Sequence, residues 1–157
     1  MPAVDPFNLQ RFVDAQQHVI ASVIAELRHG HKRSHWMWFI FPQLKGLGHT
    51  ARSNFFGITS LQEAAAYLQH PVLGPRLNEC TQLANAVDGH SAEDLFGEID
   101  AMKFRSSMTL FAKATPAKAA PAKAAPENQI FIDALEKYFA GEFDPLTIDY
   151  LREQNSI

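Results

Sequence analysis

Residues 29–35 form a basic turn, His-Gly-His-Lys-Arg-Ser-His, whose side chains are the first candidates for chemistry. Three histidines so close together could ligate a metal, but zinc sites need further ligands at characteristic spacings, which the sequence lacks. We therefore predict no metal site. Lys32 and Arg33, beside the backbone N–H groups that follow Ser34, could instead hold a phosphate or carboxylate. The plainer alternative is that the turn is solvent-exposed and that its histidines complement the end of a helix.

A second candidate is the segment that contains Gly46, Gly48, Arg52 and Ser53. Glycines allow a backbone to approach a ligand closely, and Arg52 could contribute a positive charge. The spacing matches neither the P-loop nor the dinucleotide-binding pattern. An ordinary turn is therefore the alternative.

A third segment, residues 100–107, adds candidates for acid–base chemistry to those of the basic turn. Asp100 or His35 could act as a general acid or base, helped by Lys103, with Ser106 and Ser107 as polar neighbours. Asp100 and Lys103 are also one helical turn apart, which is typical of a surface ion pair. The sequence contains no Gly-x-Ser-x-Gly nucleophile motif.

The aromatic stretch of residues 34–43 lies between the first two candidates and includes both tryptophans of the chain, Trp36 and Trp38. Their side chains could pack in the core or stack on a planar ligand. In a helix they would point about 200° apart, so one face cannot hold both. We expect a short buried helix capped by Ser34 and followed by an extended segment, because Pro42 disfavours helical backbone before it. Gln43 would then lie at the rim of a site.

The remaining elements are also predicted to be helical. Asp5-Pro6 is typical of a helix start, and apolar residues at helical spacing predict one helix of about twenty-two residues that ends at Gly30. Residues 46–57 are expected to form a loop. Further helices are predicted at Ser60–Gln69, Arg76–Val87, Ser91–Phe96, Asp100–Ala112, near Ile130 to Gly141, and from Asp144-Pro145 onward. These elements predict an all-α protein, a single domain over residues 1–157 with six or seven helices.

Residues 113–126 differ in kind from the rest of the chain. Lysine, alanine and proline alternate there, with Pro116, Pro121 and Pro126 five residues apart. Proline at this spacing prevents a regular helix, and the composition offers no apolar surface to bury. We predict a flexible insertion on the surface of the domain.

Composition and charge exclude several classes of protein. Apolar residues make up 46% of the 157 residues and charged residues 20%, the balance of a globular domain. The net charge of −3 would be −6 without the three lysines of residues 113–126, which argues against an extended nucleic-acid surface. The single cysteine, Cys80, cannot form an internal disulfide. The sequence shows neither a membrane span nor a secretory signal, so we expect a cytoplasmic protein, and no cofactor is predicted.

Several motifs together resemble a bacterial family known as domain of unknown function 1810. They are Lys32–Gln43 with Gly46-Leu47-Gly48, Tyr67-Leu68 with His70-Pro71, Asp100–Lys103 with Ser106–Phe111, and Phe139–Asp144. The resemblance covers nearly the whole chain except the insertion. It implies a mainly helical fold and supplies no established activity. Members are often automatically labelled calpastatin, but calpain inhibitors of that name are disordered, whereas 11% aromatic residues indicate a packed domain.

The sequence therefore leaves three functional hypotheses. The first is an uncharacterised cytoplasmic protein that binds a small anionic or nucleotide-like ligand, held by Lys32, Arg33 and Arg52 with Trp36 or Trp38 stacked on it. The second is a small enzyme, of hydrolase or transferase type, that uses the same pocket. The third is a protein-interaction module in which residues 113–126 are recognised by a partner.

Overall fold

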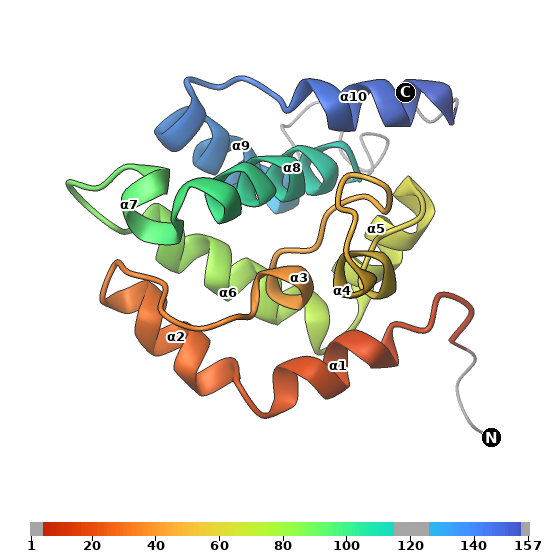
Figure 1. Cartoon of the computed structure of the whole chain (residues 1–157), viewed down its shortest axis with the longest axis horizontal. Helices are drawn as coiled ribbons and strands as arrows, with labels where there is room; N and C mark the ends of the chain where they lie inside the picture. The colour runs from red at the N-terminus through yellow and green to blue at the C-terminus, as the bar shows by residue number, and fades with distance from the viewer. Residues whose placement is uncertain (1–4, 115–125, 155–157) are drawn as a thin grey trace.

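The structure, a computed structural model, describes residues 5–114 and 126–154, and these residues form ten α-helices and no strand (Figure 1). The protein is all-α, as predicted, but the expected number of six or seven helices was too low. The helices are α1 (Gln10–Gln17), α2 (Ile20–Arg28), α3 (Met37–Ile40), α4 (Ala51–Phe55), α5 (Leu61–Gln69), α6 (Leu73–Asn85), α7 (Ala92–Phe96), α8 (Glu98–Ala114), α9 (Pro126–Phe139) and α10 (Pro145–Glu153).

The first predicted helix is in fact two helices, α1 and α2, and this accounts for part of the difference. The chain leaves helical geometry at Val19, where φ is −125° and ψ is −8°. Near the break, Gln16 is buried, and its side-chain amide donates to the carbonyl of Phe39 at 2.6 Å and to the hydroxyl of Tyr67 at 2.9 Å. The change of direction lets α1 pack on α3 while α2 packs on α6.

The helix start was also placed too early. Asp5 does satisfy two backbone N–H groups there, because its carboxylate accepts from Leu9 at 2.8 Å and from Gln10 at 3.0 Å. However, Asn8 has a φ of 52°, in the left-handed region, and regular helix begins only at Gln10.

The aromatic segment forms the expected short buried helix, α3, which ends at Phe41, where φ is −123° and ψ is 71°. Ser34 is not its cap, because Trp36 occupies that position without a side-chain cap. The two tryptophans do point to different environments: Trp36 is 1% exposed, whereas Trp38 is half-buried at the edge of the core.

The predicted loop of residues 46–57 contains a helix, α4, which sequence reasoning missed. Thr50 caps it, because the Thr50 hydroxyl accepts the backbone N–H of Ser53 at 3.0 Å. The segments on either side meet in an isolated parallel bridge between Leu44 and Ile58. Gly57 lies so close to this contact that a Cβ there would be 2.5 Å from the Cβ of Lys45, which explains why glycine occupies the position.

The later helices agree more closely with expectation. Ser60 caps α5, Ser91 caps α7 through a complete capping box with Asp94, and Asp144 caps α10. Helix α6 begins at Leu73 rather than Arg76, because Pro75 lies in its first turn, where a missing N–H costs no helical hydrogen bond.

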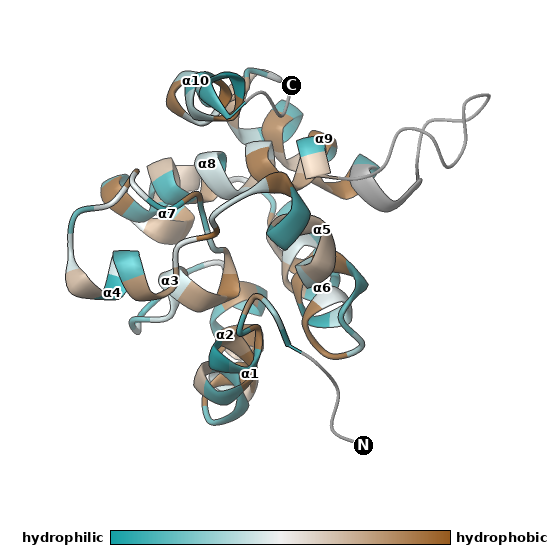
Figure 2. Cartoon of the chain, turned by 90° about the vertical axis from the view of Figure 1, so that its right-hand side faces the viewer, coloured by the Kyte–Doolittle hydropathy of each residue, from teal (hydrophilic) through white to brown (hydrophobic). Residues whose placement is uncertain are grey.

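Helix α8 runs through the middle of the domain and packs on α5, α7, α9 and α10. Helix α10 lies at one end of the molecule, and α1 and α2 lie at the opposite end (Figures 1 and 2). The predicted insertion overlaps two helix ends, because Lys113 and Ala114 belong to α8 and Pro126 begins α9. The rest of it, residues 115–125, lies outside the described residues.

Candidate functional site

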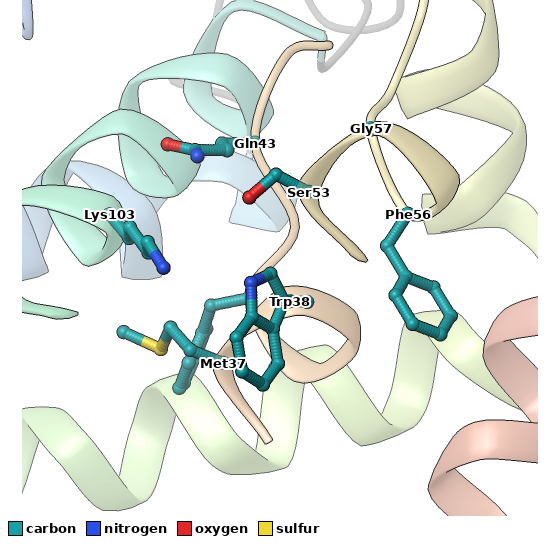
Figure 3. A pocket seen from close by; sticks show the side chains of 8 residues that line it. Met37, Trp38, Gln43, Ser53, Phe56, Gly57 and Lys103 are labelled. Atoms are coloured by element: carbon teal, nitrogen blue, oxygen red, sulfur yellow. The ribbon is translucent and has the colours of Figure 1, made fainter. Parts of the chain in front are cut away.

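A small pocket opens where α3, α4 and α8 meet. Its lining consists of Met37, Trp38, Phe41, Gln43, Ser53, Phe56, Gly57 and Lys103. The space is about 10 Å³, room for roughly one water molecule. Figure 3 shows the polar ends of Trp38, Gln43, Ser53 and Lys103 turned toward this space, while Phe56 lies to one side. The pocket therefore brings together residues from two of the three candidate segments and from the aromatic stretch.

The indole Nε1–H of Trp38 is the most unusual group in the pocket. This nitrogen is buried and has no hydrogen-bond partner among the residues that the structure describes. A buried N–H donor without a partner costs about 1–3 kcal/mol, so most such groups in proteins are satisfied by protein, water or ligand. Trp38 thus presents an unused donor to a space of the size of one oxygen atom.

Two cationic side chains lie against the Trp38 ring. The guanidinium carbon of Arg52 and the ammonium nitrogen of Lys103 are each 5.1 Å from the ring centroid. Such contacts stabilise a cation through the negative face of the ring. They also place two positive charges against one indole ring.

Ser53 adds a second donor. Thr50 is positioned to donate its hydroxyl hydrogen to the Ser53 Oγ at 3.0 Å, which leaves the hydrogen of Ser53 free to point into the pocket. Gly48 keeps this wall close, because a Cβ there would lie 2.5 Å from the Ser53 Oγ and 3.5 Å from the side-chain nitrogen of Gln43. Gly48, Ser53 and Gln43, all predicted site residues, thus lie close together.

Lys103 is linked to the basic turn through Asp100. The Asp100 carboxylate lies 2.8 Å from the ammonium of Lys32 and 3.8 Å from that of Lys103. Lys32 also donates to the carbonyl of Ser34 and lies 5.0 Å from the Trp36 ring. The side chain of Lys32 is only 7% exposed and its charge is paired with Asp100, so Lys32 does not contribute to the pocket.

The basic turn is held by Glu26, a residue of α2 that the sequence did not single out. Its carboxylate accepts the backbone N–H groups of Arg33 and Ser34 at 2.6 and 3.0 Å, the Ser34 hydroxyl, and the indole N–H of Trp36 at 3.0 Å. Partial burial alone would raise the pKa of Glu26, but these hydrogen bonds outweigh it and lower the pKa to about 2. Trp36 is therefore fixed in the core and offers no face to a ligand.

Replacing Glu26 by glutamine should lower the free energy of unfolding by about 1–2 kcal/mol at neutral pH, because hydrogen bonds to a carboxylate are stronger than neutral ones. The folded pKa of about 2 lies below the ordinary value of 4.5, so the stabilisation is complete above pH 4.5 and is lost as the pH falls toward 2. Urea denaturation at several pH values should show the difference between wild type and variant shrinking over that interval. Glu79→Gln, at an exposed position of α6, is the control. A difference that does not change with pH would contradict this account.

The other predicted site residues lie outside the pocket. Arg33, Ser34 and His35 are exposed, and Gly46 faces Tyr150 of α10. The remaining two are buried in α8: Ser106 donates to the Asp144 carboxylate at 3.1 Å, and the Ser107 hydroxyl has no partner among the described residues.

Of the residues predicted for acid–base chemistry, Lys103 lines the pocket, whereas His35 and Asp100 do not. His35 is exposed, and Asp100 is engaged by the two lysines. The described residues contain no group of three or more His, Cys, Asp or Glu side chains that could hold a metal. None of the described helices is long and apolar enough to span a bilayer.

The arrangement defines a class: a single helical domain with a small donor-lined pocket built around a half-buried tryptophan. Comparison with known proteins gives the family. Residues 6–151 match the model described as protein of unknown function (DUF1810), and the chain belongs to this family. It is also similar to the crystal structure of the conserved hypothetical protein Rv1873 from Mycobacterium tuberculosis, with 53% identity, a TM-score of 0.86, and coverage of 94% of this chain and 99% of that one. A search of curated proteins finds no match.

Proposed function

We propose that this protein binds a small anionic ligand, with Trp38, Ser53, Gln43 and Lys103 in contact with the anion. The observation that carries the proposal is the unpaired Trp38 indole N–H in a pocket whose other polar groups can all donate hydrogen bonds. None of the described residues that line the pocket carries a carboxylate, and the nearby Asp100 carboxylate is closer to Lys32 than to Lys103.

The ligand's anionic group, and not a planar ring, would occupy the pocket. Trp36 is buried, and the Trp38 ring already has Arg52 and Lys103 against it, so neither indole is an open stacking surface. A nucleotide-like ligand would therefore enter by its phosphate, with its base outside. The space admits one oxygen, which leaves the remainder of the anion outside it. Lys103 lines the pocket, and Arg52, 5.1 Å from the centroid of the Trp38 ring, is the second cation within reach of the proposed ligand.

The indole N–H signals in an NMR spectrum test this proposal directly. The chain has two tryptophans, and the Trp38→Phe variant identifies the Trp38 signal. Titration with inorganic phosphate, methyl phosphate, dimethyl phosphate and acetate should shift that signal with at least one anion. The Trp36 signal, whose N–H is bonded to Glu26, should stay nearly constant.

Lys103→Met should weaken this binding by roughly tenfold or more, because it removes a charge-assisted hydrogen bond. Lys137→Met is the matched control, because Lys137 is an exposed lysine at the end of α9. If no anion of the panel moves the Trp38 signal at millimolar concentration, the proposed function is wrong and the pocket holds only water. Equal effects of the two lysine variants would remove Lys103 from the site.

A further inference from the structure

From the charges and donors around the pocket, we infer that the anion is a tetrahedral dianion, and specifically the terminal phosphate of a phosphate monoester. This inference rests on the proposed function and assigns the chemical class of its ligand. Its first support is the balance of charge. Its second support is the direction from which the donors come.

Four charged side chains surround Trp38 and its neighbours. The Asp100 carboxylate is closer to Lys32 than to Lys103, at 2.8 Å against 3.8 Å, and Lys32 is the more buried of the two lysines. Asp100 therefore mainly neutralises Lys32. The charges of Lys103 and Arg52 remain, and no carboxylate pairs with Arg52 among the described residues.

The uncompensated charge of the cluster is thus +2, and both positive charges lie against the same indole ring. A phosphate monoester carries between about −1.5 and −2 charges at neutral pH, which would balance it. A carboxylate or a phosphate diester carries one negative charge and would leave the cluster positive. Because the pocket is partly shielded from water, this difference in charge should affect binding more than it would on an open surface.

The donors approach from four separate parts of the chain. The Trp38 indole N–H comes from α3, the Ser53 hydroxyl from α4, the Gln43 amide from the segment after α3, and the Lys103 ammonium from α8. Figure 3 shows these groups around a common space. The acceptor sites of a carboxylate lie in one plane, whereas the three terminal oxygens of a phosphate fan out in three dimensions. Because the inner space admits one oxygen, a phosphate monoester leaves two further charged terminal oxygens outside it, whereas a carboxylate leaves one, so a phosphate suits the two cations better.

The size of the pocket sets the orientation of the ligand. One phosphate oxygen fits beside the Trp38 N–H, and the ester oxygen must point outward because the inner space holds a single oxygen-sized group. A substituent on the ester oxygen should therefore cost little affinity. In contrast, a second ester bond would remove one negative charge and one terminal oxygen.

Titrations of the full-length protein, followed by the Trp38 indole signal, separate the effect of ligand charge from the effect of the ester substituent. Methyl phosphate and inorganic phosphate should bind with similar affinity at pH 8. Dimethyl phosphate, of similar shape but with one charge, and acetate, planar with one charge, should each bind roughly tenfold more weakly or worse. Arg52→Met should reduce this preference for methyl phosphate over dimethyl phosphate, whereas Arg28→Met, at an exposed position of α2, should leave it unchanged.

Failure of the inference differs from failure of the proposed function. If acetate or dimethyl phosphate binds as well as methyl phosphate, the site is an anion site without preference for a dianion, and the inference is overturned. If inorganic phosphate binds but methyl phosphate does not, the outward orientation of the ester is wrong and a monoester is not the ligand. If none of the four anions binds, the proposed function itself falls.

Discussion

Replacement of Arg11 by methionine should lower the free energy of unfolding by about 3–5 kcal/mol, because it leaves a buried carboxylate without its charged partner. Glu63 is 2% exposed, and its Oε2 lies 2.8 Å from the Arg11 guanidinium. The Glu63 Oε1 accepts the backbone N–H and the hydroxyl of Thr59 at 2.9 and 2.8 Å. These two bonds cannot replace the lost positive charge.

The guanidinium also joins two separate parts of the backbone. Its N–H groups donate to the carbonyls of Phe7 and Asn8 before α1, and to those of Phe55 and Gly57 at and just beyond the end of α4. With the bond to Glu63, the five N–H donors of Arg11 all have acceptors. A lysine has the charge but not the planar fork, so Arg11→Lys should lose a large part of the same stability.

Urea denaturation of a double-mutant cycle measures the contribution of the pair. Arg11→Met and Glu63→Gln are combined, and the double variant should be more stable than the sum of the single effects predicts, because it contains no unpaired buried charge. Arg28→Met at an exposed position of α2 should change stability by less than about 0.5 kcal/mol. A wild-type-like Arg11→Lys variant would show that charge alone matters and that the hydrogen bonds to the four carbonyls contribute little.

Arg11 illustrates why the sequence predicted some parts of this protein and not others. The starts of α5, α7 and α10 follow from side chains that bond to the backbone three residues away, at Ser60, Ser91 and Asp144. Such local patterns are readable in a sequence. The partners of Arg11 are up to 52 residues away, and nothing near Arg11 in the sequence indicates them.

The same distinction applies to the candidate site. The sequence pointed to Gly48, Ser53, Trp38 and Lys103 because of their types, and the structure places them together. The sequence could not show that Lys32 forms an ion pair with Asp100, 68 positions further along the chain. The sequence also contained no sign that Glu26 accepts hydrogen bonds from the backbone of the basic turn, because an isolated glutamate on a helix is usually solvated.

The core beneath the pocket gives the second large effect, at Phe104. This residue follows Lys103 in α8 and is completely buried. Its ring centroid lies 4.6 Å from that of Phe96 and 4.9 Å from that of Phe41, and rings from α9 complete the cluster at 6.1 Å (Tyr138) and 6.3 Å (Phe139). Phe104 thus connects Phe41, at the end of α3, with α7 and α9.

Phe104→Ala should lower the free energy of unfolding by about 3–5 kcal/mol, through lost burial and the cavity left among four aromatic rings. Phe104→Leu keeps most of the apolar volume and loses the ring contacts, so its cost should be about 1–2 kcal/mol. Met102→Ala on the same helix is the matched control, because Met102 is 70% exposed and should change stability by less than about 0.5 kcal/mol. Chemical denaturation gives the free energy of unfolding of each of the three variants and so tests this order. If Phe104→Ala costs no more than Phe104→Leu, the surrounding rings collapse into the space, and the aromatic cluster is not the rigid support that positions Lys103 beside Trp38.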